Sequence, residues 1–442
     1  MCIRDRLATF DTVRNYAVKA SAEHFAGATA DPHPDEDGLA KAVATIDAMN
    51  LHDAQLLARA FATYFHLANL SEENYRVSVL HQRENQVEDD EAVDPVNELT
   101  TAYHQLLTEM GPAKAKALLE KLEFHPVFTA HPTEARRKAV EGKIRRIAEL
   151  LEENKRLGGS DKKENVRRLY NEIDALFRTS PIALKKPTPV EEADTILDIF
   201  DNTLFTTIPK VYHRFNDWLL GDKAGLEQPQ CPAFFHPGSW IGSDRDGNPN
   251  VTAKVSRQVA RKFSDHVISA LEEATRTVGR NLTMESETTP ASAELKSLWS
   301  HQKEMSERLT DKAALISTKE LHRAVMLVMA DRLRYTIERD ADLMYHSCDD
   351  FIADLQVVQR SLAEAGAKRS AYGPLQDLIW QAQTFGFHMV EMEFRQHSVV
   401  HARALEDIRE HGLHGERGEL QPMTHEVLDT FRALGAIQKR NG

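Results

Sequence analysis

Three separate stretches of the chain hold the residues best suited to chemistry. The first is VFTAHPTEARRK, residues 127–138, in which His131 follows an apolar run and precedes a proline and a basic segment. The second is GSWIGSDRDGNPNVT, residues 238–252, and the third is FHMVEMEFRQHSVVH, residues 387–401. Each stretch joins a short apolar run to a polar turn, which is typical of a strand that ends in a loop before a helix.

The alternation of the first stretch places His131 on the same face as Val127 and Thr129, at the carboxyl end of a strand. Pro132 then ends the strand, and Thr133 suits the N-cap of a helix. Sites in β/α folds are built at the carboxyl ends of strands, which favours a catalytic histidine. A histidine that only caps the turn, beside solvated basic residues, fits the same local pattern. The local sequence leaves both interpretations open.

The second stretch contains three glycines and forms a tight polar loop in which two aspartates flank Arg245. Its alternating oxygen-bearing side chains resemble a calcium loop, but Pro249 and Val255 stand where such a loop needs glycine and glutamate, so we exclude calcium. Two interpretations remain. Either the loop is structural, with Arg245 held by the neighbouring aspartates, or it is a rigid turn that presents Trp240 and Arg245 to a ligand.

The third stretch alternates between two kinds of side chain. The apolar set is Val390, Met392 and Phe394, and the charged set is Glu391, Glu393 and Arg395. An ordinary edge strand would show this alternation with its charges in solvent. In a helix-covered barrel the charged face would point inward, where charges are costly unless they are paired or used. Arg395 at the carboxyl end suits the grip of a phosphate or carboxylate group through paired hydrogen bonds. His397 and His401 have the spacing of a zinc pair, but no further ligands accompany them.

The elements that position these residues are mostly helices. Apolar spacing predicts a helix that begins after Thr252, and helices over about 134–157, 162–178, 190–221, 316–338, 350–364 and 398–411. Only 124–131, about 238–242 and 388–395 are typical of strands, each followed by a helix. The pattern predicts an α/β fold that is predominantly helical.

Composition excludes several classes of protein. The chain has 442 residues, 41% hydrophobic and 28% charged, with a net charge of -13, which is typical of a soluble globular protein and not of a nucleic-acid binder. The three cysteines, Cys2, Cys231 and Cys348, are widely spaced, which favours reduced thiols and a cytoplasmic location. No apolar run reaches the roughly 18 residues of a membrane span. We found no GxxxxGK[ST], GxGxxG, GxSxG or HExxH motif.

Together the three stretches closely resemble the phosphoenolpyruvate carboxylase family. Two further stretches agree in type and order, ARAFATYFHLANLSEE at residues 58–73 and KKPTPVEEA at residues 185–193. The resemblance implies a helix-decorated (β/α)8 barrel of the TIM type, with about three of the eight strands in this chain. It also implies a homotetramer that joins phosphoenolpyruvate and bicarbonate, with Mg²⁺ or Mn²⁺, to form oxaloacetate and phosphate.

The resemblance assigns roles to individual residues. His131 matches the essential histidine, expected to act as the base that takes a proton from carboxyphosphate, and Arg395 matches an active-site arginine. Trp240 matches a tryptophan beside the substrate pocket, and Arg245 and Asp246 are expected to bind substrate or shape the loop. Residues 1–6 are set aside as a candidate non-native tail. Residues 7–442 then form the amino-terminal part of one barrel domain, with a helical region at 7–120 and the first strands and their helical insertions at 121–442.

The chain also departs from the family pattern. Ser243 stands where the family usually has glycine, and TSPIA at residues 179–183 replaces the usual TDEIR. His397 stands where an acid is common. We expect Ser243 to tighten the loop without abolishing it, and the loss of an acid and an arginine from 179–183 to change local salt bridges.

Length is the largest departure, because family members are about twice as long. We therefore expect the metal-binding carboxylates to lie beyond residue 442 and this chain alone to be inactive, since phosphoryl chemistry needs a divalent ion. Two alternatives are a non-catalytic relative that acts as a helical scaffold and a different phosphate-handling enzyme of similar fold. The coding sequence downstream discriminates between a carboxylase and a scaffold.

Overall fold

The structure is a computed structural model that describes residues 40, 43–44, 46–87, 99–129, 137–180, 187–305 and 319–441. The chain divides into two compact units. Unit 1 comprises residues 1–96 and 133–186, and unit 2 comprises residues 97–132 and 187–442. The chain therefore enters unit 2, returns to unit 1 and then completes unit 2.

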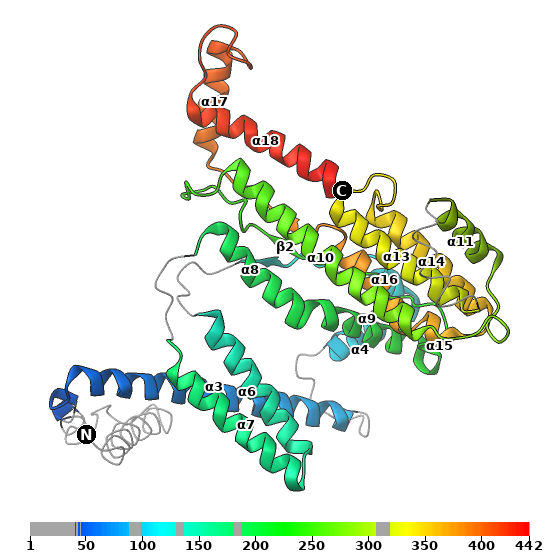
Figure 1. The fold of residues 1–442 in the computed structure, drawn as a ribbon, viewed down its shortest axis with the longest axis horizontal. Helices are drawn as coiled ribbons and strands as arrows, with labels where there is room; N and C mark the ends of the chain where they lie inside the picture. Colours follow the sequence, from blue (N-terminus) through cyan, green and yellow to red (C-terminus); the bar gives the residue numbers. More distant parts are fainter. Residues whose placement is uncertain are drawn as a thin grey trace. The chain divides into compact units, whose positions relative to one another are not determined.

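The described part of unit 1 contains the helices α3 (Leu51–Val87), α6 (Lys138–Arg156) and α7 (Gly159–Arg178). Figure 1 shows α6 and α7 side by side. Val140 and Ile147 lie two turns apart on one face of α6 and pack with Leu70 and Leu176 in a buried cluster. The helices predicted over 134–157 and 162–178 are confirmed within the described residues.

Unit 2 holds the strands and most of the helices. Its helices before β2 are α4 (Leu99–Met110), α5 (Pro112–Leu119), α8 (Pro189–Ile199), the π-turn η1 (Phe200–Leu204), α9 (Phe205–Leu220) and the 3₁₀ turn η2 (Gly221–Lys223). Those after β2 are α10 (Ala253–Asn281), α11 (Ala293–Met305), α13 (Leu321–Glu338), α14 (Cys348–Glu364), α15 (Lys368–Ala371), α16 (Pro374–Phe385), α17 (Ser398–His411) and α18 (Pro422–Asn441). The predicted helices over 190–221, 316–338, 350–364 and 398–411 correspond to α8–α9, α13, α14 and α17.

A three-stranded parallel sheet lies within unit 2. Its strands are β1 (Val127–Phe128), β2 (Gly238–Ser239) and β3 (Glu391–Met392), in the order β1-β2-β3. Val127 pairs with Gly238, which pairs with Glu391. Isolated bridges between Phe124 and Phe235 and between Asp244 and Arg395 lengthen the pairing at each end. The three predicted strand segments are thus confirmed, but the regular strands are shorter than predicted.

The two faces of the sheet differ in their surroundings. Phe128 and Met392 pack against the main core of unit 2. Val127 on the opposite face is 41% exposed, and the Glu391 side chain is 55% exposed. The alternation in the third stretch is therefore confirmed. The charged residues share the exposed face, and the apolar residues share the covered face.

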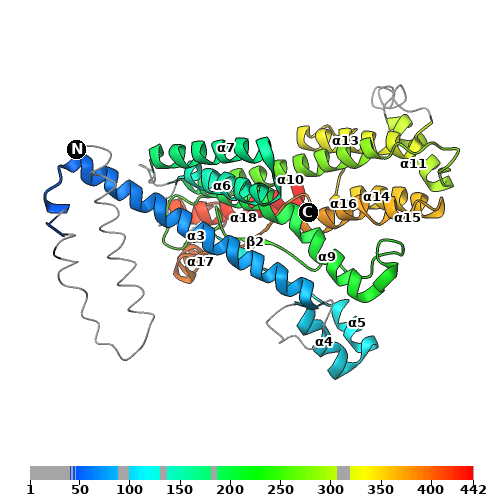
Figure 2. The same cartoon turned by 90° about the horizontal axis from the view of Figure 1, so that it is seen from below.

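Helix α10 packs against several other helices of unit 2. Its predicted apolar stripe is buried at Val259, Phe263, Val267 and Leu271. Thr252 caps the helix by accepting a hydrogen bond from the Val255 backbone N–H at 3.3 Å. Helix α13 runs beside α10 in both Figure 1 and Figure 2. The helix thus ties the loop after β2 to the main core.

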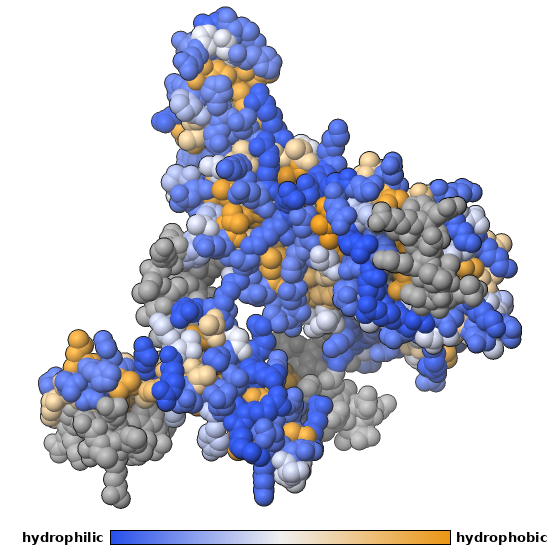
Figure 3. Space-filling model, in the orientation of Figure 1, coloured by the Kyte–Doolittle hydropathy of each residue, from blue (hydrophilic) through white to orange (hydrophobic). Residues whose placement is uncertain are grey.

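The surface is mainly hydrophilic with scattered apolar patches, as Figure 3 shows for one face. None of the helices in the described part of the chain is long and apolar enough to cross a membrane. Cys231 and Cys348, the two cysteines that fall within the described ranges, are not in disulfides.

Candidate active site

The carboxyl ends of β2 and β3 meet in one small region, which we call the carboxyl edge and define by residues 239–246 and 393–396. The Arg245 backbone N–H donates to the Arg395 carbonyl at 2.9 Å. The Arg395 N–H donates in turn to the Ser243 carbonyl at 3.2 Å. These two bonds hold the loop after β2 against the end of β3. Two of the three sequence stretches are thus brought together.

Arg395 is the most accessible cation of the carboxyl edge. Its side chain is 48% exposed, and its Nε donates to the Glu393 carboxylate at 3.0 Å, with a second contact from Nη2. Its guanidinium carbon lies 5.7 Å from the centre of the Trp240 ring. Two charged residues of the exposed face, Arg395 and Glu393, are therefore paired with each other. The Arg395 guanidinium also lies beside the Trp240 ring, within the range of a cation–π contact. An incoming anion would compete with Glu393 for this fork.

Arg245 occupies a different environment from Arg395. It is 8% exposed, and its guanidinium donates to the Ser243 carbonyl at 3.1 Å and to the Ser256 hydroxyl at 2.8 Å. It also lies 5.5 Å from the centre of the Phe394 ring. Burial lowers the pKa of Arg245, and the nearby Glu426 partly opposes that shift. The guanidinium is therefore held by Ser243 and Ser256, and the interpretation that the neighbouring aspartates hold Arg245 is wrong.

Ser243 joins the loop to the neighbouring strand through its side chain. It is fully buried, and its hydroxyl donates to the Glu393 carbonyl at 2.8 Å. The Ser243 side chain therefore adds a hydrogen bond across the carboxyl edge, in agreement with the expectation that it tightens the loop. Gly242, the preceding residue, has φ of 72°, and a Cβ there would lie 2.5 Å from a Val259 methyl group. Only glycine fits this close approach to α10.

The helices that follow β2 and β3 both begin near this edge. The first turn of α10 is capped by Thr252, and the Ala253 N–H also donates to the Glu426 carboxylate at 2.5 Å. His397 caps α17, because its Nδ1 accepts from the Val399 N–H at 3.2 Å. His397 therefore has a capping contact, and no group of three or more potential metal-binding side chains exists in the described ranges.

The other predicted site residues stand as follows. Asp246 is exposed, and its backbone N–H donates to the Asp244 carboxylate at 3.1 Å. His131 lies outside the described residues, although Val127 and Phe128 just before it form β1. Most of the TSPIA segment also lies outside them. The structure thus brings together Trp240, Arg245 and Arg395.

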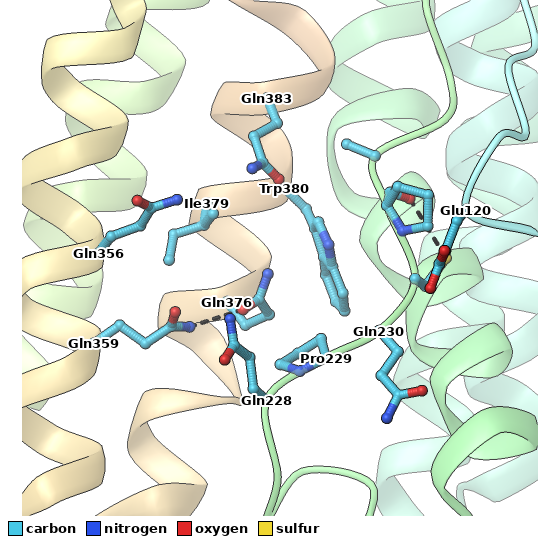
Figure 4. Close-up of a pocket in the computed structure, with 13 residues that line it drawn as sticks. Glu120, Gln228, Pro229, Gln230, Gln356, Gln359, Gln376, Ile379, Trp380 and Gln383 are labelled. Atoms are coloured by element: carbon cyan, nitrogen blue, oxygen red, sulfur yellow. Dashed lines mark hydrogen bonds between the residues drawn. The ribbon is translucent and has the colours of Figure 1, made fainter. Parts of the chain in front are cut away.

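A separate pocket of about 400 Å³ contains none of the carboxyl-edge residues (Figure 4). Glutamines gather around the nearly buried Trp380. The Gln359 amide donates to the Gln376 side chain at 2.7 Å and to the Ala371 carbonyl at 2.9 Å. These bonds connect α14 to α15 and α16. The buried glutamines of this pocket therefore have a structural role in holding these helices together.

Sequence reasoning missed the supporting residues of the carboxyl edge. Ser256 lies in the first turns of α10, just beyond the second stretch, and Glu426 lies on α18, more than twenty residues after the third. A serine one turn after a helix N-cap carries no signal of its own. Glu393 was recognised as charged, but its pairing with Arg395 two residues later appears only in the structure.

Comparison with known proteins places the chain near one family. The family model described as phosphoenolpyruvate carboxylase matches residues 8–417. A phosphoenolpyruvate carboxylase of Roseiflexus castenholzii is 31% identical over 437 residues, which cover 89% of this chain and 46% of that protein. Proteins of the same name from Azorhizobium caulinodans and a Synechococcus species are 29% and 30% identical and cover 87% and 84% of this chain. The chain spans about half the length of the curated relatives it matches.

Proposed function

The chain belongs to the phosphoenolpyruvate carboxylase family, and on this premise we propose that it takes part in the carboxylation of phosphoenolpyruvate by bicarbonate to give oxaloacetate and phosphate. The observation that carries this proposal is the accessible Arg395 fork beside Trp240 at the carboxyl edge. Family membership does not favour the alternative of a non-catalytic scaffold.

We assign the binding of the phosphoryl group to Arg395. Phosphate oxygens match the planar fork of a guanidinium, and the Glu393 carboxylate already shows where an anion lies against it. Trp240 forms the wall beside this position. Asp246 stays assigned to the substrate side of the loop, where its exposure leaves it accessible.

We assign Arg245 a positioning role instead of the substrate contact predicted from the sequence. Its guanidinium is buried and bonded to Ser243 and Ser256, so it is directed into the protein. The backbone of the same residue holds Arg395 in register. Arg245 therefore acts on substrate only through Arg395 and the loop.

The proposed reaction has two stages. A bicarbonate oxygen attacks the phosphorus, the bond from phosphorus to the enol oxygen breaks, and carboxyphosphate and an enolate result. His131 then takes the proton of carboxyphosphate, which releases CO₂ and phosphate, and the enolate carbon attacks CO₂ to form the new C–C bond. A histidine suits this transfer because its pKa lies near neutral pH.

A divalent ion, Mg²⁺ or Mn²⁺, would neutralise charge that develops on the phosphoryl group when it is bound. The described residues do not fit such an ion, because they hold no cluster of three or more histidine, cysteine or carboxylate side chains with suitable geometry. We therefore derive no step through the metal and assign it no ligand in this part of the chain.

We also propose that the sheet forms part of a (β/α)8 barrel in a homotetramer. Support for the barrel comes from three adjacent parallel strands, a helix soon after β2 and β3, and charged residues on a single face. The tetramer rests on the family resemblance, as does the division of the chain into a helical region at 7–120 and a strand-containing region at 121–442.

Light scattering of the native gene product tests the assembly. A mass of four chains is expected, and a monomer would contradict it.

Replacement of Arg395 tests the proposed function directly. Oxaloacetate formation by the native gene product that carries this sequence is measured by coupling to malate dehydrogenase. We expect Arg395→Gln to lower kcat/KM by about 100-fold or more, since a lost charge-stabilising donor costs that much. Arg280→Gln, on the exposed end of α10, serves as the matched control with unchanged activity. Unchanged activity of Arg395→Gln would refute its assignment.

A further inference from the structure

A second concentration of positive charge lies in unit 2, away from the carboxyl edge. It lines an open pocket of about 510 Å³ where α18 ends over α10 and the end of α13 (Figure 1). We call it the basic pocket and define it by its five cations, Arg257, Arg261, Arg339, Lys439 and Arg440. Ala260, Ala436 and Ile437 supply its apolar part.

Among the four cations other than Arg339, the described part of the chain provides ion pairs with only one carboxylate. Arg261 and Arg440 share one carboxylate, that of Asp265, at 3.1 and 3.4 Å. Arg257 donates to a backbone carbonyl, that of Asp429, at 3.4 Å. Lys439 is exposed and forms no ion pair with the part of the chain that the structure describes. Positive charge is therefore in excess even before Arg339 is considered, although the whole chain carries -13.

Arg339 is held at this pocket by an unusual backbone conformation. It ends α13 with φ of 62°, in the left-handed region where glycine is the usual residue. Its guanidinium donates to the Arg440 carbonyl at 3.2 Å. Burial has the largest effect on the pKa of Arg339 and lowers it. The positive charges of Arg440 and Arg261 also lower this pKa, whereas the Asp265 carboxylate raises it. A bound anion would relieve this repulsion.

Helix ends explain only part of the cluster. Cations are favourable near helix C-termini, which accounts for Arg339, Lys439 and Arg440. Arg257 and Arg261 lie instead in the first half of α10, where the helix dipole gives them no such support. Their convergence on the same pocket therefore needs a different explanation.

We propose that the basic pocket binds a small phosphorylated anion. Its volume is in the range of small-molecule sites, and four of its five cations are arginines, whose forks match phosphate oxygens. A nucleic acid is a poorer match, because the cations converge on one pocket of an acidic chain and do not form an extended stripe. This inference is independent of the proposed carboxylation.

Titration calorimetry of the full 442-residue chain with pyrophosphate tests the proposal. We expect one molecule bound per chain, and a dissociation constant raised about tenfold or more in Arg257→Gln/Lys439→Gln, since two charge-assisted contacts are lost. The matched control is Arg280→Gln/Lys368→Gln, which removes the same charge from exposed positions outside the pocket and should bind as the wild type does. Absence of binding, or an equal effect in the control, would overturn the proposal.

Two further measurements separate binding from folding and from other ligands. Lys439→Gln alters an exposed side chain, so its thermal melting should match the wild type while its affinity for pyrophosphate falls. Arg339→Gly relieves the left-handed strain, so we expect its melting temperature not to decrease although its affinity is lost. Retained affinity in both variants, or tighter binding of a single-stranded oligonucleotide than of pyrophosphate, would refute the site.

Discussion

At the scale of single residues, the two arginines of the carboxyl edge have different environments although their sequence contexts are similar. Arg395 is half exposed and paired with a carboxylate, whereas Arg245 is buried and bonded to serines. The sequence could identify both as candidates, because charged residues in strand-end motifs are visible in the letters. It could not rank them, because burial of Arg245 depends on Ser256 and Phe394, which come from other elements.

Replacement of Ser243 by alanine tests the bond across the carboxyl edge. The change removes a hydroxyl that donates to the Glu393 carbonyl at a fully buried position. We expect the free energy of unfolding to fall by about 1 kcal/mol in urea denaturation. The control is Ser300→Ala on α11, whose hydroxyl is exposed and bonds within its own helix. An effect no larger than that of the control would show that this bond does not stabilise the loop.

Two glycines of the same loop separate backbone strain from steric overlap. Gly242 and Gly247 have φ of 72° and 71°, but only a Cβ at Gly242 would meet another side chain. Gly247→Ala should therefore cost about 1 kcal/mol of unfolding free energy, and Gly242→Ala about 3 kcal/mol, as measured by urea denaturation. Equal costs would contradict the close approach of the loop to Val259.

At the scale of elements, the sequence predicted α8, α9, α10, α13, α14 and α17 of unit 2, but it did not predict α4, α5, α11, α15, α16 or α18. Long helices with strong apolar stripes, such as α10 and α14, were located well. One face of each helix is buried, and this produces a helical spacing of apolar residues that is visible in the sequence. The strands were placed but predicted too long. The chain turns at Trp240 directly after β2, and Met389 before β3 has a positive φ, so regular pairing stops early.

The junction of α13 and α14 contains a histidine that makes stability depend on pH. His322 is 2% exposed and shares a hydrogen bond of 2.9 Å with the Ser361 hydroxyl, and burial lowers its pKa from 6.5 to about 4. In the unfolded chain, His322 is therefore protonated below pH about 6.5, whereas in the folded chain it is protonated only below pH about 4. Stability is lost as the pH falls through this window.

His322→Gln should remove this contribution. By linkage, we expect His322 to account for about 2 kcal/mol of the stability lost between pH 7.5 and pH 5, measured by urea denaturation at both values. The variant should show a correspondingly smaller loss. His425→Gln, at an exposed position of α18, is the matched control and should retain the wild-type dependence. An identical loss in the wild type and His322→Gln would contradict the buried neutral histidine.

At the scale of the whole molecule, an acidic chain concentrates cations at two places in unit 2. One is the carboxyl edge with Arg395, and the other is the basic pocket. We propose anionic ligands for both places, which differ in their relation to the sheet. The carboxyl edge lies at the strand ends, where β/α folds build active sites, whereas the basic pocket lies among α10, α13 and α18. Catalysis is therefore proposed only for the first.

The most direct test of the central claim is fixation of radiolabelled bicarbonate by the native gene product, compared between the wild type and His131→Asn. We predict phosphoenolpyruvate-dependent incorporation of label into oxaloacetate in the wild type. In His131→Asn we predict a rate lower by about 100-fold or more, the contribution of a general base, with substrate binding retained in calorimetry. No incorporation by the wild type, or undiminished incorporation by His131→Asn, would contradict the account.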